Sequence, residues 1–394
     1  YETESVTDDQ LEAISRSSGR MGLEQTNLGL LTDGLRAERE QGITIDVAYR
    51  YFTTSRRSFI IADAPGHVQY TRNMVCGASI ADLALLLVDV RAGLTEQTRR
   101  HATVASLLGI RHLVVCVNKM DLVGYDRRRF EEIRRAFDDF ATRLEVHDVT
   151  CIPISALQGD NVVERSDEMR WYDGPSLLHH LEEVHISSDR NLIDLRFPVQ
   201  RVVRPISSSE LHDYRGYAGQ VASGVLEVGD EVVVLPSGFS TRVEAIETAD
   251  GPLEEAFPPQ SVVVRLADEL DISRGDMLCR LHNQPLVSQD LSAMVCWMSE
   301  TPLTTGAKLA IKHTSRWSRV LVRELRYRLD VNTLHRDQKA AELELNDIGR
   351  VDLRAQVPLF YDEYRVNRAT GSFILVDEVT NATVGAGMLL RQPG

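Results

Sequence analysis

The five residues "DAPGH", Asp63 to His67, place a carboxylate, a Pro-Gly turn and an imidazole directly after the apolar run "FIIA". Asp63 can hold Mg²⁺ through a water molecule, and Gly66 can bring its backbone N–H against a phosphate that any side chain would obstruct. Pro65 restricts the turn, and His67 is placed to orient an attacking water. D-x-x-G is common in ordinary turns, so alone this segment, Ala64 included, is more often structural than functional.

A second group is "NKMD", Asn118 to Asp121, at the end of the apolar run "LVVCV". The two carboxylate oxygens of Asp121 can accept hydrogen bonds from two adjacent N–H donors, which the edge of guanine offers and that of adenine does not. Each such bond contributes roughly 1.5–3 kcal/mol, so a strong preference for guanine is attainable. We expect Asn118 to brace the loop, the aliphatic part of Lys119 to cover the base, and Met120 to belong to the same binding segment.

Two weaker segments complete the pattern. In "ISALQG", Ser155, Ala156 and Leu157 form a small-residue turn whose backbone N–H can reach the guanine carbonyl oxygen. In "AEREQGITID", Thr44 can offer its hydroxyl to Mg²⁺ and its N–H to a terminal phosphate, although alone it reads as a polar residue on a strand. Because all four segments occur in this order, the sequence predicts a guanine-nucleotide site.

Three of the four segments follow apolar runs typical of strands. Predicted strands and helices alternate along this part of the chain, at 59–63, 70–79, 83–90, 95–108, 112–119, 127–145 and 149–155. Continuous apolar strands that alternate with helices indicate a parallel sheet covered on both faces. We therefore expect a doubly wound, mostly parallel α/β domain, with the candidate residues at the carboxyl edge of its sheet.

The composition changes after the predicted helix in "DGPSLLHHLEEV". Short strand-like pieces separated by glycine-containing turns follow, for example "RGYAGQVASGVLEVGDEVVVLPSG" and "SFILVDEVTNATVGAGMLL". Such pieces are typical of small antiparallel barrels. We predict a nucleotide-binding domain over 1–188 and two all-β domains over 189–287 and 288–394.

A nucleotide domain of this type normally opens with a strand and a G-x-x-x-x-G-K-[ST] loop that cradles the phosphates. The sequence contains no Gly-Lys dipeptide and begins with "YETESVTDDQ", which is typical of the region after such a loop. Either the native N-terminus extends further, or the loop has been lost. We expect the first, because a sheet without its central strand would expose an edge that is normally buried.

Composition narrows the possible partners and location. The 394 residues carry a formal net charge of −14, so nucleic acid is not an expected partner. The five cysteines form no C-x-x-C pair, which favours a reduced cytoplasmic location. No apolar run has the length needed to span a bilayer, so we expect no membrane association.

Over nearly its whole length the sequence resembles the elongation factor Tu-like GTPases. The resemblance rests on "AEREQGITID", "DAPGHVQYTRNM", "NKMDLV" and "SAL", together with the glycine-rich β segment quoted above. Within this group the sequence is similar to the GTPase subunits of bacterial sulfate adenylyltransferases, on "QTRRHATVASLLGIRHLVVCVNKMDLV", "RFPVQRVVRP" and "VDEVTNATVGAGM". The phosphate loop of the family cannot be carried over, because no position matches it.

The resemblance implies a P-loop-type GTPase domain followed by two β-barrels, with GTP or GDP and Mg²⁺ as ligands. It assigns Thr44 and Asp63 to the Mg²⁺ shell, with Asp63 acting through a water, Gly66 to the γ-phosphate and His67 to water orientation. The implied guanine pocket consists of Asn118, Lys119, Asp121 and Ser155 to Leu157.

The resemblance also implies a function. GTP binding and hydrolysis would promote the reaction of ATP with sulfate to adenosine 5′-phosphosulfate and pyrophosphate in a separate, smaller catalytic subunit. Two alternatives remain open, a translation factor that delivers an aminoacyl-tRNA and a non-catalytic scaffold with a vestigial nucleotide site. The acidic charge and "QTRRH" argue against the first, and the presence of Asp63, His67, Asn118 and Asp121 argues against the second.

Overall fold

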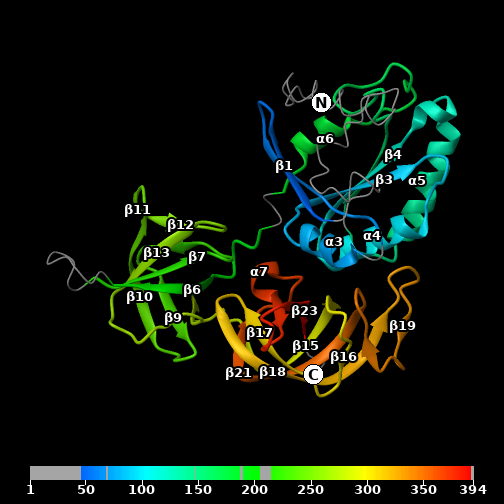
Figure 1. The fold of residues 1–394 in the computed structure, drawn as a ribbon. Helices are drawn as coiled ribbons and strands as arrows, with labels where there is room; N and C mark the ends of the chain where they lie inside the picture. Colours follow the sequence, from blue (N-terminus) through cyan, green and yellow to red (C-terminus); the bar gives the residue numbers. More distant parts are fainter. Residues whose placement is uncertain (1–45, 68–69, 147, 187–189, 205–213, 392–394) are drawn as a thin grey trace, which may run out of the picture. The chain divides into compact units, whose positions relative to one another are not determined.

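The computed structural model describes residues 46–67, 70–146, 148–186, 190–204 and 214–391. The chain divides into two compact units (Figure 1). One comprises Tyr1–His185 with Val331–Leu334, and the other comprises Ile186–Asp330 with His335–Gly394. Within the described ranges, no helix is both long and apolar enough to cross a membrane.

The first unit alternates strands and helices, as predicted. Its elements are β1 (Ala48–Thr53), β2 (Ser58–Asp63), α3 (Thr71–Ala78), β3 (Leu83–Asp89), α4 (Glu96–Leu107), β4 (His112–Asn118), the 3₁₀ turn η3 (Met120–Val123), α5 (Arg127–Ala141), β5 (Asp148–Pro153) and α6 (Leu177–Glu183). Strands β3, β4 and β5 form a parallel sheet with β4 in the centre. Parallel pairing brings the carboxyl ends of these strands to one edge of the sheet.

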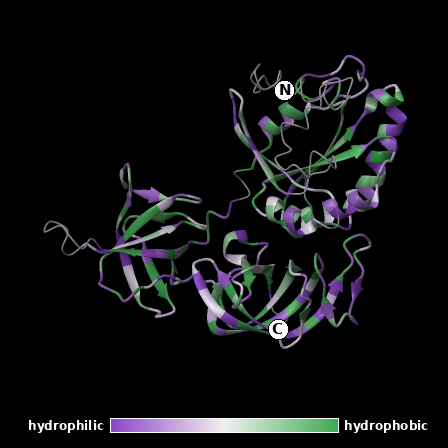
Figure 2. Cartoon of the chain, in the orientation of Figure 1, coloured by the Kyte–Doolittle hydropathy of each residue, from purple (hydrophilic) through white to green (hydrophobic). Residues whose placement is uncertain are grey.

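Strand β4 is covered on both faces, which explains its continuous apolar sequence. Val115 and Val117 pack in one cluster with Phe130 of α5, whereas Val114 and Cys116 pack in another on the opposite face. This alternation is the period-two geometry of a strand. Figure 2 shows the resulting hydropathy, with hydrophobic colouring along the parallel strands and alternating hydrophobic and hydrophilic residues along α5.

The β1–β2 hairpin differs from the prediction. The sequence predicted β2 as a buried strand and did not predict β1, but the two strands pair antiparallel, with Ala48 opposite Asp63. Among the described strands β2 pairs only with β1, and its Ile60 is 65% exposed. Because β2 has only one described neighbour, it is covered less than the central strand β4. The prediction of a buried strand, made from the apolar sequence of β2, was therefore wrong.

In the described residues, the second unit forms two antiparallel barrels and one short helix. The elements of the first barrel region are β6 (Arg196–Val203), β7 (Gly216–Gln220), β8 (Leu226–Glu227), β9 (Glu231–Leu235), β10 (Ser240–Thr248), β11 (Gly251–Leu253), β12 (Glu255–Ala256), β13 (Ser261–Leu266) and β14 (Met277–Arg280). Strands β10, β13, β7, β6, β14 and β9 pair in that order, and β9 pairs again with β10. The sheet therefore closes on itself, as the glycine-punctuated strand pattern predicted.

The second barrel closes in the same way. Its elements are β15 (Leu286–Trp297), β16 (Leu303–Thr304), β17 (Lys308–His313), β18 (Arg316–Leu329), β19 (Arg336–Asp337), β20 (Glu342–Leu343), β21 (Ile348–Tyr361), α7 (Arg368–Gly371), β22 (Ser372–Val376) and β23 (Thr383–Leu390). Strands β17, β22, β23, β15, β21 and β18 pair in that order, and β18 pairs again with β17. The predicted architecture of an α/β domain followed by two barrels is confirmed.

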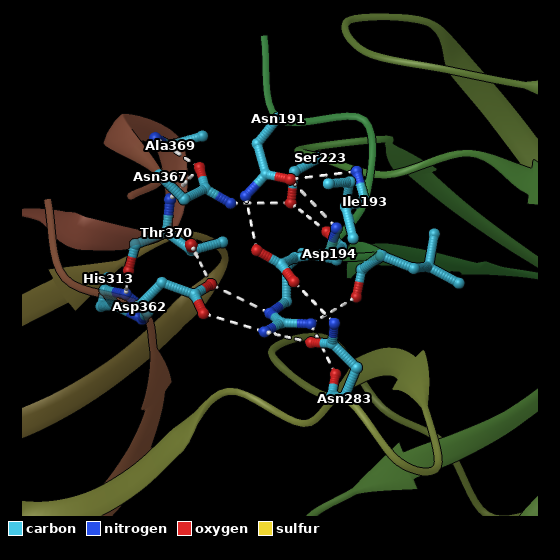
Figure 3. A network of polar contacts seen from close by, with 12 residues as sticks. Asn191, Ile193, Asp194, Ser223, Asn283, His313, Asp362, Asn367, Ala369 and Thr370 are labelled. Atoms are coloured by element: carbon cyan, nitrogen blue, oxygen red, sulfur yellow. Dashed lines mark hydrogen bonds and ion pairs between the residues drawn. The ribbon is translucent and has the colours of Figure 1, made fainter. Parts of the chain in front are cut away.

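A buried ion pair joins the two barrels (Figure 3). The Arg196 guanidinium of β6 donates two hydrogen bonds of 2.9 Å to the two carboxylate oxygens of Asp362, which follows β21. The Arg196 side chain is 3% exposed, and it also donates to the backbone carbonyl of Asn283. The Thr370 hydroxyl donates to Asp362 at 2.7 Å. Both charges are thus compensated in an environment where an unpaired charge would be costly.

Replacing Arg196 with methionine is expected to lower the free energy of unfolding of the second unit by about 3 kcal/mol, because the substitution leaves the Asp362 carboxylate buried without its counter-charge. Chemical denaturation followed by circular dichroism measures the effect. Arg319→Met is the matched control, since Arg319 pairs with Glu378 at 2.7 Å but is 73% exposed. The control should change stability by less than about 1 kcal/mol, and equal losses in both variants would contradict the prediction.

His313, the last residue of β17, is expected to make the second unit sensitive to acid. It is fully buried, and its Nε2–H donates to the Thr370 carbonyl at 2.7 Å. Burial lowers the pKa of His313 from 6.5 to about 4, with Asp362 acting in the opposite direction and Arg316 in the same direction. The unfolded chain binds this proton first, so the free energy of unfolding should fall as the pH drops from 6.5 towards 4, by up to about 3 kcal/mol. Denaturation at several pH values should show a smaller decrease in His313→Gln, and identical slopes would contradict the assignment.

Candidate nucleotide-binding site

Two loops of the first unit meet at the carboxyl edge of the parallel sheet. The first runs from Asn118, the last residue of β4, to Asp121, and the second follows β5 and contains Ser155 to Leu157. In the parallel register Val117 lies opposite Pro153, so both loops leave the sheet at the same level. The sequence-predicted residues of these two loops are therefore neighbours in the fold.

The Asn118 side chain ties the two loops together. Its Oδ1 accepts hydrogen bonds from the backbone N–H of Lys119 at 2.7 Å and from that of Ala156 at 3.0 Å. An amide oxygen has two lone pairs, so one side chain can satisfy both donors. Asn118 thus fixes the backbone of each loop relative to the other.

Ser155 orients Asp121. The Ser155 hydroxyl is buried and donates to Asp121 Oδ1 at 2.6 Å, while Asp121 itself is only partly buried. Each carboxylate oxygen can accept more than one hydrogen bond, so Asp121 keeps acceptor capacity for two donors on a ligand. The arrangement is a carboxylate held in one orientation by a neighbouring loop, as recognition of a guanine edge requires.

The remaining residues of these loops lie in different environments. Met120 is completely buried in the core beneath the loop, and its backbone N–H donates to the Ile154 carbonyl at 3.2 Å, so its side chain supports the loop from below.

The Ser155 N–H donates to the Asp160 carbonyl at 3.1 Å. Because the Ala156 N–H is bound to Asn118, the sequence-predicted backbone contact to the guanine carbonyl is best sought at Leu157, a residue that is 64% exposed.

Asp89 and Arg91 are functional candidates that the sequence interpretation missed. Lys119 has a left-handed backbone with φ 67°, and its ammonium group donates to Asp89 Oδ2 at 3.0 Å. Arg91 donates to both carboxylate oxygens of Asp89, and these bonds, followed by the one from Lys119, hold the pKa of Asp89 well below its usual range. Asp89 ends strand β3 as Asn118 ends β4, and the two residues are register partners. Its position after an apolar run was a signal available in the sequence.

The "DAPGH" segment follows the hairpin strand β2. Asp63 is the last residue of β2 and is partly buried, Pro65 is buried, and His67 is exposed. Ala64 and Gly66 are partly buried, and the His67 carbonyl accepts a hydrogen bond from the Tyr70 N–H at 2.9 Å, directly before α3. The structure thus places His67 at the surface, where it can meet a bound ligand. Thr44 lies outside the described residues.

The carboxylate at this segment is compatible with Mg²⁺ held largely by a nucleotide and water. Among the described residues, no group of three or more histidine, cysteine, aspartate or glutamate side chains is arranged to hold a metal ion. Mg²⁺ in nucleotide sites is usually held by one or two carboxylates together with phosphate oxygens and waters. A single partly buried carboxylate, Asp63, is compatible with that mode of binding.

Comparison with protein families agrees with this geometry. The Elongation factor Tu GTP binding domain matches residues 3–202, and the GTP-eEF1A C-terminal domain-like family matches residues 290–390. The first match contains the loops of Asn118 and Ser155, and the second covers the second barrel. The chain is thus a guanine-nucleotide-binding protein of the elongation factor Tu type.

Curated relatives extend the similarity over the whole chain. Sulfate adenylyltransferase subunit 1 of Bacteroides fragilis (strain YCH46) is 50% identical over 392 residues, which cover 99% of this chain and 81% of the relative. The protein of the same name from Cellvibrio japonicus (strain Ueda107) is 50% identical over 394 residues, which cover 100% and 82%. The chain belongs to the sulfate adenylyltransferase subunit 1 family.

A third relative is longer. The "Bifunctional enzyme CysN/CysC" of Mycobacterium tuberculosis (strain ATCC 25618 / H37Rv) is 61% identical over 392 residues, which cover 99% of this chain. The chain spans 64% of the length of that relative. The similarity therefore concerns one part of the bifunctional protein.

Proposed function

We propose that the chain is the GTP-hydrolysing subunit of a sulfate adenylyltransferase. The observation that carries its nucleotide chemistry is the junction of two loops through Asn118 and Ser155, which holds the Asp121 carboxylate ready for a guanine edge. The names of relatives about 50% identical to the chain support the choice of reaction.

In the proposed reaction, ATP and sulfate give adenosine 5′-phosphosulfate and pyrophosphate in a separate, smaller catalytic subunit. A sulfate oxygen attacks the α-phosphorus of ATP, and the bond from that phosphorus to the pyrophosphate oxygen breaks. The product contains a phosphate–sulfate anhydride, so the reaction is unfavourable as written. GTP hydrolysis in this subunit would supply the driving force, through segments that change conformation when the γ-phosphate is lost.

Each predicted site residue has a role in this proposal. Thr44 and Asp63 would hold Mg²⁺, Asp63 through a water, and Gly66 would donate its N–H to the γ-phosphate. His67 would orient the attacking water, while Ala64 and Pro65 shape the turn. The guanine pocket would comprise Asn118, Lys119, Met120, Asp121, Ser155, Ala156 and Leu157, with Asp89 keeping Lys119 in place.

The proposal also concerns organisation and location. We infer a nucleotide domain over 1–188 and β domains over 189–287 and 288–394, acting in the cytoplasm as part of a heteromer with the catalytic subunit. Support for a partner comes from the word "subunit" in the names of the relatives. The net charge of −14 argues against nucleic acid as a ligand.

The deciding experiment measures GTP hydrolysis by the full-length protein with and without a candidate catalytic subunit, in the presence of ATP and sulfate. We expect the partner to stimulate hydrolysis and adenosine 5′-phosphosulfate to accumulate in step with it. Stimulation by ribosomes and charged tRNA instead would identify a translation factor. Nucleotide binding without hydrolysis under either condition would identify a scaffold.

A further inference from the structure

Helix α4 makes a direct hydrogen bond to the "DAPGH" segment. His101 Nε2 lies 2.9 Å from the carbonyl oxygen of Gly66. A carbonyl oxygen only accepts hydrogen bonds, so this ring nitrogen must carry the proton and act as the donor. His101 is 35 residues from Gly66 in the sequence, and no motif predicted the contact.

The contact is close as well as specific. A Cβ atom added to Gly66 would lie 2.3 Å from Gln97 Nε2 and 3.0 Å from His101 Cε1. Gln97 and His101 are four residues apart on α4, so they lie on one face of the helix. This face leaves no room for a side chain at position 66 unless its own side chains move. A side chain at position 66 would therefore displace the amide end of the exposed Gln97 and press against the His101 ring.

The imidazole is suited to a fixed role as a neutral donor. Burial lowers the pKa of His101 below its ordinary value, and the neighbouring Arg100 acts in the same direction, while the hydrogen bond to Gly66 opposes them. At neutral pH the ring therefore keeps one N–H, on Nε2, directed at the Gly66 carbonyl. Nε2–H is a donor in the neutral tautomer and in the imidazolium alike, so the contact does not depend on a charged ring.

The position of the Gly66 carbonyl determines where the backbone of His67 begins and in which direction it runs. The peptide unit between Gly66 and His67 is planar, so fixing its oxygen also fixes the nitrogen and Cα of His67. On its other side, the His67 carbonyl accepts the hydrogen bond from Tyr70. The backbone of His67 is thus held from both ends, although its side chain is exposed.

We propose that His101 is a positioning residue for GTP hydrolysis, which holds the Gly66–His67 peptide so that the His67 side chain is kept where it can orient the attacking water. This inference rests on the proposed function, because His67 and Gly66 have their roles only in a GTP-hydrolysing site. It assigns to α4 a part in the chemistry and not only in the packing of the sheet. It also links any displacement of α4 to the rate of hydrolysis.

The test compares His101→Ala with His101→Gln in the full-length protein. His101→Ala should lower kcat for GTP hydrolysis by about 10-fold or more, with KM and the affinity for GDP changed less than about threefold, because misdirected groups cost rate more than binding. The amide nitrogen of glutamine can take the place of Nε2, so His101→Gln should recover most of the lost rate. A general packing defect would not be repaired by a donor at this one position.

A matched control is His180→Ala, which removes another partly buried imidazole from the same unit, on α6, and should leave kcat unchanged. Wild-type turnover by His101→Ala, or equal loss in the alanine and glutamine variants, would overturn the inference. Absence of GTP hydrolysis in the wild-type protein would overturn the proposed function together with it. The two failures are therefore distinguishable.

Discussion

Replacing His67 with alanine is expected to lower GTP turnover by about 10³-fold, equivalent to about 4 kcal/mol of activation free energy, while the affinity for GDP stays nearly unchanged. His67 is exposed, so its removal costs little packing. Its proposed work, orienting the attacking water, is needed only when the γ-phosphate is present. Single-turnover GTP hydrolysis and GDP titration measure the two quantities separately.

The matched control for His67 is His179→Ala on α6. His179 is also exposed in the same unit, and its Nε2 lies 3.2 Å from a carboxylate oxygen of Glu183. This substitution should leave both turnover and GDP affinity at the wild-type level. Proportional loss of turnover and GDP affinity in His67→Ala would show that the residue supports the loop and not the hydrolysis step.

Asp121→Asn is expected to change which base the protein binds. Two charged hydrogen bonds to guanine are lost or weakened, so GTP affinity should fall roughly 10³-fold. Asparagine offers one acceptor and one donor, which match the N1–H and the C2 carbonyl of xanthine. Ser155 can still donate to the side-chain oxygen at position 121, so the NH₂ group of the new asparagine should face the ligand. Competition of GTP and xanthosine triphosphate for the site measures the change.

The comparison variant for this prediction is Asp121→Ala. It should lose GTP affinity to a similar degree and gain none for xanthosine triphosphate, because alanine has no group that pairs with the base. Loss of both nucleotides in Asp121→Asn, with the protein still folded, would mean that Asp121 does not contact the base. A smaller effect, about 10-fold, is expected from Ser155→Ala, which removes only the group that orients the carboxylate.

The sequence predicted those parts of the structure that depend on local patterns. Strands β3 and β4 are apolar between their end residues, and the covering of β4 on both faces requires such a run. The same rule failed for the hairpin. "AYRYFT" mixes aromatic and polar residues without a core-facing pattern, and Tyr51 in it is 73% exposed. A strand whose main contact is its hairpin partner carries little sequence signal.

The sequence alone did not predict contacts between residues that are far apart along the chain. The ion pair of Lys119 with Asp89 follows from the register of β3 on β4, and the ion pair of Arg196 with Asp362 joins residues 166 positions apart. The motif around Asn118 was recognisable because its residues are consecutive. The partners that orient those residues were not, because they come from other elements of the fold.

The junction between the barrels limits how the chain can be recombined. Arg196 belongs to one barrel and Asp362 to the other, so each barrel contains a buried charge whose neutralising group lies outside it. A chimera that took only one barrel from a relative without this pair would leave the other with an orphaned charge. The two barrels should therefore be exchanged together, as one module.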